Sequence, residues 1–565
     1  MRVKLSYSVC TATPWNSKFD AVGAFTMRER KTAEEMKQER ELFKTLYGKS
    51  KKPNPYKTNK YSCFTVQGDT CYFLIGSWQR LKDELDKAHE PYTIEEAFDP
   101  AVMPEPDISA LEGSELRSGQ AETLALLTTA RTGMICCGVG YGKSFCIKML
   151  CMVYPTLNIL IVCPSGEVVK ELYKDISRAL PGQVGILNMD SPDVNGKRII
   201  VSTTKSMTKI KPEQVQLLLF DEAHSAGMNQ TGFDVMKFCF GRRFGFTATP
   251  TRNQGDYKYM EALFGPVLQQ VTYQEAQEAG SVTPISYYML PIDKKNPRLT
   301  NLVEVETVEG TEWLGSEQVM PWHRPTGRTK KRGLPDYLKT RLFYISNYNR
   351  NDMIVDTFKR IQAECPEAQI LIMVQSLEHL IRLGERIPGC LYMHGERGSL
   401  AKYKEKKGLE NVYVEKYELD KDKAARNKYL YEQGRAKYLI ATGTLKQGVN
   451  LKYLSVLIRA DGAVSDIPSV QIPGRLARLA DNKPMAYLID FTDNFCEEAH
   501  GRAIARRKEY NKQSWTEIDS LQTIINNLKE TANDCIEGRE KETETDQEEC
   551  QGLETAETGN ESPAH

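Results

Sequence analysis

The sequence lacks the features that mark secreted, membrane and zinc-binding proteins. No apolar stretch approaches the ~20 residues that a membrane-spanning helix needs, and the start, Met1-Arg2-Val3-Lys4, lacks the apolar core of a signal peptide. The 14 cysteines include no C-x-x-C pair, and the 7 histidines show no metal-ligand spacing. These absences argue against a membrane protein and against structural zinc. We expect a cytoplasmic protein whose cysteines are free thiols.

Charge is balanced overall but unevenly distributed. The 565 residues include 75 Lys and Arg and 75 Asp and Glu. Residues 531–565 hold about eleven acidic and two basic residues and few large apolar ones, so we expect a disordered acidic tail. The first ~60 residues hold roughly fourteen basic and six acidic ones, and basic surfaces attract nucleic-acid phosphates. Basic loops that only keep a protein soluble would give the same count.

A glycine-rich turn follows an apolar segment. Met134-Ile135-Cys136-Cys137 is followed by Gly138-Val139-Gly140-Tyr141-Gly142-Lys143-Ser144. Glycines let backbone N–H groups close around phosphates, and the next helix points its positive end at the same place. Lys143 can reach the β- and γ-phosphates, and the Ser144 hydroxyl can bind Mg²⁺. The phosphate-loop pattern G-x-x-x-x-G-K-[ST] has Cys137 in place of its first glycine, while the inner G-x-G-K-[ST] is intact.

Two adjacent carboxylates end a second apolar segment. Leu217-Leu218-Leu219-Phe220 runs directly into Asp221-Glu222-Ala223-His224. In phosphate-loop ATPases one carboxylate holds the metal from a neighbouring strand, and a further group orients the attacking water. Each half alone is common, because glycine turns are frequent and an Asp-Glu pair often only starts a helix. The glycine-rich turn and the carboxylate pair occur in this order, each at a strand end. Together they predict a site for ATP and Mg²⁺, in which Asp221 binds the metal and Glu222 polarises the attacking water.

Further short segments point to a family. They are Leu116-Arg117-Ser118-Gly119-Gln120, Thr247-Ala248-Thr249-Pro250, ATGTLKQGVN at 441–450 and QIPGRLAR at 471–478. With the two motifs above, they resemble the signature segments of superfamily 2 DEAD/DEAH-box helicases, in the family's order. Within the superfamily the chain is most similar to the phage UvsW group and to restriction-type DNA helicases. That narrower resemblance rests on the L-R-x-x-Q start, the stretch 263–266 (LFGP) and the Arg350-Asn351 pair.

The resemblance implies roles in ATP binding and hydrolysis. The nucleotide would contact Arg117, Gln120, Gly138, Val139, Gly140, Tyr141, Gly142, Lys143, Ser144 and Gly448. Hydrolysis would also use Gln471, Arg475 and Arg478. Arg475 and Arg478 are three apart, so on a helix they share one face, and arginine pairs bidentately with phosphate. If they lie on a second domain, hydrolysis requires that domain to close. An isolated R-x-x-R would more often be an ordinary basic helix face.

The resemblance also implies a groove that holds one nucleic-acid strand. Its lining would be Pro164, Ser165, Thr203, Thr204, His224, Thr247, Thr249, Gln375, Thr442 and Thr444. Hydroxyls and backbone amides bind phosphate without reading bases, so we expect sequence-independent binding. His224 would couple the lobes, although a helix-capping histidine would look identical.

Strand-like and helical segments alternate in two series. The strands are expected at 133–137, 159–163, 198–202, 217–220 and 244–247, and then at 369–374, 437–441, 455–459 and 485–491. This alternation is typical of α/β folds with a parallel sheet covered on both faces, and the resemblance implies two tandem RecA-like domains. A hairpin at 61–66 and 71–75 and a charged helix over Lys31–Tyr47 predict a small α+β N-terminal domain. We expect domains at 1–105, 106–282 and 283–510, and a helical segment with the acidic tail at 511–565.

The chain is therefore expected to be an ATP-dependent DNA helicase or translocase of a bacterial cell or a phage-infected bacterium. An RNA helicase, a duplex translocase without strand separation and a non-motor ATPase that remodels a protein complex are the alternatives. Two insertions, the basic 322–333 and the Lys-rich 400–428, are each either a phosphate contact or a solvated loop.

Overall fold

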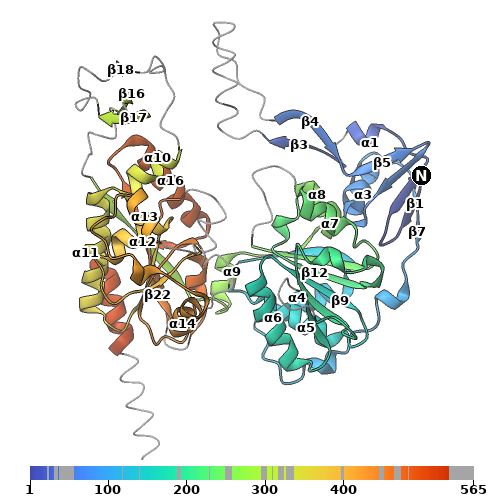
Figure 1. The fold of residues 1–565 in the computed structure, drawn as a ribbon. Helices are drawn as coiled ribbons and strands as arrows, with labels where there is room; N and C mark the ends of the chain where they lie inside the picture. The colour runs from blue at the N-terminus through green and yellow to red at the C-terminus, as the bar shows by residue number, and fades with distance from the viewer. Residues whose placement is uncertain are drawn as a thin grey trace, which may run out of the picture. The chain divides into compact units, whose positions relative to one another are not determined.

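The chain folds as two compact units, Met1–Ser281 and Val282–His565 (Figure 1). The computed structural model describes residues 1–21, 25–30, 36, 56–117, 119–138, 140–187, 193–227, 229–248, 257–293, 302–307, 310–315, 324–325, 336–395, 400–443, 451–463, 473–480 and 483–533. In this described part, no helix is both long and apolar enough to cross a membrane.

The first unit is built on a seven-stranded sheet whose pairings are all parallel. In spatial order its strands are β10 (Val184–Leu187), β11 (Ile199–Thr203), β9 (Ile159–Cys163), β12 (Leu217–Asp221), β13 (Arg242–Thr247), β8 (Thr132–Cys137) and β14 (Val267–Val271). The five strands predicted from apolar runs are confirmed. The edge strands β10 and β14 escape prediction because β10 is short and β14 carries two glutamines. β13 also begins two residues early, at the buried Arg242 and Arg243.

Helices cover both faces of this sheet. One face packs against α4 (Gln120–Thr129), α5 (Lys143–Val153) and α6 (Gly166–Ala179), and the other against α7 (Gln230–Met236) and α8 (Tyr257–Phe264). Side chains alternate between the faces along a strand, so Leu217 and Leu219 join one core and Leu218 and Phe220 the other. Because both faces are buried, β9 reads as an unbroken apolar run, and so does β12 up to Asp221.

The N-terminal part has its own five-stranded sheet. Its order is β5 (Phe64–Gln67), β6 (Thr70–Phe73), β2 (Cys10–Thr13), β1 (Arg2–Leu5) and β7 (Thr93–Glu96), with α1 (Lys18–Ala21), α3 (Trp78–Lys87) and the two-stranded β3 (Thr26–Arg30) and β4 (Tyr56–Ser62) beside it. The predicted hairpin is confirmed as β5–β6, which turns through Gly68 at φ 63°. Tyr61 and Ser62 belong instead to β4. The helix expected over 31–47 lies outside the described residues except for Met36.

Buried contacts hold this N-terminal sheet on the rest of the first unit. Arg243 is fully buried, and its guanidinium donates to the carbonyls of Tyr7 (3.1 Å) and of Leu263 at the end of α8 (2.7 Å). Arg80 of α3 pairs with Glu261 of α8. A Cβ on Gly76 would lie 2.0 Å from the Glu261 carbonyl oxygen, so only glycine fits there. The N-terminal sheet is therefore an integral part of the first unit.

The second unit repeats the seven-stranded parallel sheet. In spatial order its strands are β20 (Leu391–Met393), β21 (Tyr438–Ala441), β19 (Gln369–Met373), β22 (Leu454–Arg459), β23 (Ala486–Asp493), β15 (Ile285–Ile292) and β24 (Thr516–Glu517). The four predicted strands are confirmed. The helices are α10 (Asp336–Thr340) with a π-helical turn η9 (Arg341–Ile345), α11 (Tyr348–Glu364), α12 (Leu377–Gly384), α13 (Ala401–Lys406), α14 (Lys421–Glu432), α16 (Glu497–Lys512) and residues 521–533.

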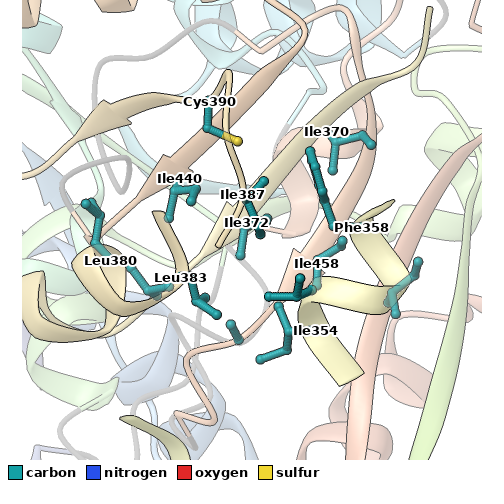
Figure 2. Close-up of a cluster of buried hydrophobic side chains, with 14 of the residues drawn as sticks. Ile354, Phe358, Ile370, Ile372, Leu380, Leu383, Ile387, Cys390, Ile440 and Ile458 are labelled. Carbon is teal, nitrogen blue, oxygen red and sulfur yellow. The ribbon is translucent and has the colours of Figure 1, made fainter. Parts of the chain in front are cut away.

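The core of the second unit lies between this sheet and its helices. Figure 2 shows Ile354 and Phe358 of α11 beside Ile370 and Ile372 of β19, with Ile458 of β22 in the same cluster. All five side chains are at most 1% exposed. The two units thus have the architecture of tandem RecA-like domains preceded by a small α+β region, which confirms the predicted fold class.

The two insertions differ in what the structure describes. A small sheet joins β16 (Leu302–Thr307) to β17 (Gly310–Gly315) and β18 (Arg324–Pro325), and the remainder of 322–333 lies outside the described residues. Residues 400–428 hold α13, a turn at Glu415–Tyr417 and most of α14. The buried Tyr417 donates its hydroxyl proton to Glu385 (2.7 Å), so this insertion is folded onto its unit.

Three fully buried arginines hold the segment that follows β22. Arg350 donates to the Ala460 carbonyl (2.7 Å) and forms an ion pair with Asp493. Arg506 donates to the Gly462 carbonyl (3.3 Å) and forms an ion pair with Asp490. Arg459 donates to the Ala463 carbonyl (2.8 Å) and forms an ion pair with Asp461. Buried charges are tolerated when they are paired and hydrogen-bonded in this way.

Candidate functional site

Two glycines of the turn that follows β8 have backbone conformations that favour glycine. Gly140 and Gly142 have φ of 96° and 99°, a left-handed conformation that glycine adopts without a Cβ clash, and α5 begins at Lys143. A Cβ on Gly142 would lie 2.4 Å from Gln120 Nε2. Cys137, where the common pattern has a glycine, is the last residue of β8 and is buried. A side chain is accommodated there because the position still belongs to the strand.

Lys143 lies against the loop that precedes it. Its Nζ donates to the carbonyl of Cys137 (3.2 Å) and lies 3.5 Å from that of Gly138. Ser144 follows as an exposed residue at the start of α5. The first residues of α5 therefore bring a cation, a hydroxyl and a helix N-terminus to one place, as anion binding requires.

Asp221, the last residue of β12, carries an unsatisfied carboxylate oxygen. Its Oδ1 is buried without a hydrogen-bond partner. Burial, and then the charge of Glu222, raise the pKa of Asp221 to about 7, while Lys143 acts in the opposite direction. A buried carboxylate with a free lone pair fits a cation, so this residue suits a divalent metal.

Glu222 and His224 are held in a strained turn. Glu222 has φ 55°, a conformation rare for residues other than glycine and often found at functional sites. His224 Nδ1 lies 3.1 Å from Glu222 Oε2 and 3.1 Å from Thr247 Oγ1 at the end of β13. His224 thus joins the carboxylate motif to the T-A-T-P segment within the first unit.

The L-R-x-x-Q element is tied to the phosphate loop. Gln120 is buried, its Nε2 donates to the Tyr141 carbonyl (2.9 Å), and its Oε1 accepts from the Arg117 N–H (3.0 Å). The Tyr141 hydroxyl is hydrogen-bonded to Thr123 Oγ1 of α4 (2.8 Å). Thr123 was not among the predicted site residues, because a single threonine inside a helix gives no sequence signal. The Arg117 side chain is exposed.

In the second unit, Arg475 lies in a 3-10 helix, η12 (Pro473–Ala477), and Arg478 follows it. The Arg478 N–H donates to the Arg475 carbonyl (3.3 Å). Residues three apart eclipse one another in a 3-10 helix, so the two lie on the same side of this turn. Arg475 is buried and Arg478 is half-buried. We call residues 473–478 the arginine turn.

The predicted groove residues lie at strand ends. Pro164 and Ser165 follow β9, Thr203 ends β11 before Thr204, Thr247 ends β13, Gln375 follows β19 closely, and Thr442 follows β21. The carboxyl ends of parallel strands share one sheet edge, so each set shares the edge of its own sheet. Some of these side chains also have local partners. Ser165 Oγ accepts from Val168 N (3.4 Å) as the N-cap of α6, and Thr203 Oγ1 accepts from Ser206 N (3.2 Å).

Five predicted site residues have no described placement. They are Val139, Thr249, Thr444, Gly448 and Gln471. Among the residues that the structure does describe, no group of three or more His, Cys, Asp or Glu is placed to hold a metal ion. A metal at Asp221 would need other ligands, for which the Ser144 hydroxyl, the nucleotide and water are the candidates.

The first lobe matches a known family. Residues 113–252 match a family model described as "Type III restriction enzyme, res subunit". These residues span the phosphate loop, the carboxylate motif and Thr247. The match confirms the resemblance to superfamily 2 helicases of the restriction type.

Individual relatives give more distant likenesses. The chain is 26% identical over 165 residues to "DNA 3'-5' translocase XPB2" of Sulfurisphaera tokodaii, covering 28% of this chain and 37% of the relative. The match thus spans little more than a third of that relative's length. Among solved structures, T4 UvsW is 14% identical with a TM-score of 0.37, covering 92% of this chain and 99% of that one. Dbp5 of S. cerevisiae, bound to RNA and ADP BeF3, is 14% identical with a TM-score of 0.49, covering 75% and 96%.

Proposed function

We propose that the chain is an ATP-dependent DNA helicase or translocase, which couples ATP hydrolysis to movement along DNA or to its unwinding and remodelling. One observation carries the proposal: the glycine-rich turn after β8 and the buried, unpartnered Oδ1 of Asp221 at the end of β12 lie at the same edge of one parallel sheet, with β13 between the two strands. The match over residues 113–252 and the second RecA-like unit support the same conclusion.

The first unit would bind the nucleotide and a metal ion. The loop 138–142 and Lys143 would hold the phosphates, with Arg117 and Gln120 at the adenine edge. Mg²⁺ would be held by Ser144 and Asp221, and when bound it neutralises charge that develops on the transferring phosphoryl group. Gln120 already donates to the loop, so base recognition and phosphate binding would be linked through one amide.

Glu222 would accept the proton of the attacking water. His224 lies within hydrogen-bond distance of the Glu222 carboxylate and would orient it. Arg475 and Arg478, with Gln471 and Gly448, would complete hydrolysis from the second unit, since charge building on the γ-phosphoryl needs a cation. ATP turnover would then depend on both units.

The strand-end residues of each sheet would contact one nucleic-acid strand through its phosphates. DNA is the proposed partner because the relative matched over 165 residues is described as a DNA translocase. We also propose the four-part division 1–105, 106–282, 283–510 and 511–565. The 1–105 part would contact nucleic acid and would move with the ATP lobe, because Arg243 and Arg80 join them.

ATPase rates with single-stranded DNA, duplex DNA, forked DNA and RNA, compared side by side, test the proposal. We expect DNA to stimulate turnover and RNA to do so less, with Lys143→Ala as the inactive control. Stronger stimulation by RNA would indicate an RNA helicase. Turnover that no nucleic acid stimulates would indicate a non-motor switch.

The relative's description as a translocase favours one second candidate, movement on duplex DNA without strand separation. Displacement of a labelled strand from a fork and of a third strand from a triplex separates the two activities. Fork unwinding supports a helicase. Triplex displacement without fork unwinding supports a translocase.

A further inference from the structure

The last three carbonyls of the arginine turn are each held by a donor from elsewhere in the second unit. The Leu476 oxygen accepts from Lys483 Nζ (3.0 Å), the Ala477 oxygen from the Thr283 N–H (2.8 Å), and the Arg478 oxygen from Thr283 Oγ1 (3.1 Å). Carbonyls at the end of a helix have no intrahelical partner and are usually left to water or caps. Here two side chains and one backbone N–H hold three consecutive carbonyls, from the residue after Arg475 to Arg478 itself.

Lys483 ties the arginine turn to the start of β22. Only 7% of this residue is exposed, and its Nζ also donates to the Lys452 carbonyl (2.7 Å), two residues before β22. Burial, and then the charge of Arg478, lower the pKa of Lys483 to about 7. A buried amine is costly unless it is hydrogen-bonded, and these two carbonyls supply that bonding.

Thr283 ties the arginine turn to the connection between the units. The first unit ends at Ser281 and the second begins at Val282, so Thr283 is the second residue of the second unit. It is 1% exposed and donates to the turn through both its backbone and its side chain. Next, the Pro284 carbonyl accepts from Ala486 N (2.9 Å), and β15 begins. The chain entering the second unit is thus attached to the arginine turn before it joins the sheet.

We propose that Thr283 is a positioning residue that couples the connection between the two units to the arginine turn, with Lys483 as a second support. The proposal rests on the proposed function, because it assumes that the arginines act in nucleic-acid-stimulated hydrolysis. Two bonds from one buried residue fix both the position and the orientation of the turn. Small displacements matter here, since a misplacement of about 1 Å can cost a catalytic site ~10²-fold in rate.

The test compares three substitutions in the full chain. Thr283→Val replaces the hydroxyl with a methyl group of similar shape, so the Arg478 carbonyl loses its donor, whereas Thr283→Ser keeps the hydroxyl. Thr357→Val is the matched control, because Thr357 is also buried in the second unit, on α11. We expect Thr283→Val to lower DNA-stimulated kcat by about tenfold, with basal rate and ATP KM unchanged. Thr283→Ser and Thr357→Val should retain stimulation.

Hydrogen–deuterium exchange over 473–480 gives a readout that does not depend on activity. We expect Thr283→Val to speed exchange in this stretch, and Thr283→Ser and Thr357→Val to leave it unchanged. Unchanged exchange in Thr283→Val would overturn the proposal, as would equal loss of kcat in Thr283→Val and Thr357→Val. If the unsubstituted chain shows no nucleic-acid stimulation, the proposed function fails, and the exchange result alone then decides whether Thr283 holds the turn.

Discussion

His224 Nδ1 lies 3.1 Å from Glu222 Oε2, across a turn in which Glu222 has a left-handed backbone. The same imidazole nitrogen lies 3.1 Å from Thr247 Oγ1 at the end of β13, so His224 lies between the carboxylate motif and that strand. We expect this carboxylate to accept a proton from the attacking water and to add little to the binding of the nucleotide itself. This difference between binding and chemistry can be measured.

Glu222→Gln should separate ATP binding from ATP hydrolysis. The amide keeps the shape of the side chain and can still contact His224, but it cannot accept a proton from water. We expect ATP to bind and persist while turnover falls by about 10²-fold or more, as for loss of a general base. Equilibrium ATP binding and steady-state turnover check this. Loss of binding together with turnover would make Glu222 a structural residue.

Lys143→Ala should abolish ATP turnover and leave the fold intact. The ammonium is at the start of α5, where it is only half-buried, so its removal opens no cavity in the core. The phosphates of ATP would lose a cation that stabilises their charge. Lys148→Ala is the control, since Lys148 lies on the same helix and forms an ion pair with Asp175 (3.5 Å). A folded Lys143→Ala chain with normal turnover would refute the proposed site.

Most central strands could be predicted from the sequence because nearly all of their residues are apolar. β9 and β12 are buried on both faces and therefore read as continuous apolar runs. β13 begins with Arg242 and Arg243, which no apolar pattern would place in a buried strand. The Arg242 guanidinium donates to the carbonyls of Thr128 (3.2 Å) and Ala130 (2.9 Å), where α4 ends. Tertiary partners of this kind cannot be read from a single sequence.

The candidate site shows the same limit. Lys143, Asp221 and Glu222 could be proposed from the sequence because phosphate binding requires a recognisable spacing from glycines and strand ends, and their roles stay a prediction. Thr283 and Lys483 could not be proposed, because they donate to backbone carbonyls 195 and 7 residues away, respectively, and every residue has a backbone carbonyl. Cys137 departs from the common loop pattern, and its place at the end of β8 explains why a side chain is accommodated there.

Arg475→Ala and Arg478→Ala should weaken DNA-stimulated hydrolysis more than ATP binding. The resemblance places these side chains in the chemical step, where an arginine can contribute ~10³-fold or more. Arg435→Ala, an exposed arginine of the same unit, is the control. Stimulated kcat and ATP affinity are the measurements. Equal losses in both would place the arginines in the ground-state binding site.

His379 should make the second unit less stable in acid. It is fully buried, and burial, with the charges of Arg350 and Arg382, lowers its pKa to about 3. Between pH 6.5 and 3 the unfolded chain binds a proton that the folded chain does not, so stability falls as the pH falls. The slope from this group is at most about 1.4 kcal/mol per pH unit. Urea unfolding at about pH 6.5, 5.5 and 4.5 measures this slope, and His379→Gln should flatten it.

We expect the N-terminal part to bind DNA and the acidic tail not to bind it. Deleting 1–105 is an unsuitable test, because it would uncover Arg243, Glu261 and the α8 surface against which Gly76 packs. A better test replaces Lys49, Lys51 and Lys52 with glutamine, which should weaken DNA binding and make it less dependent on salt. The slope of log binding constant against log salt concentration should become shallower by about 0.9 for each DNA phosphate that the protein no longer neutralises. Deleting residues 531–565 should leave affinity unchanged or raise it, because the tail carries charge of the same sign as DNA.

The matched control replaces three lysines of the N-terminal part that already have carboxylate partners. Lys4 lies 3.6 Å from Glu95, Lys18 lies 2.9 Å from Glu90, and Lys87 lies 3.0 Å from Glu84. Their replacement by glutamine changes the net charge equally but removes lysines that lie beside carboxylates. Titrations at two salt concentrations should therefore separate the two triple variants. Equal weakening would mean that only net charge matters, and no weakening in either would make the N-terminal part a protein-docking or purely structural module.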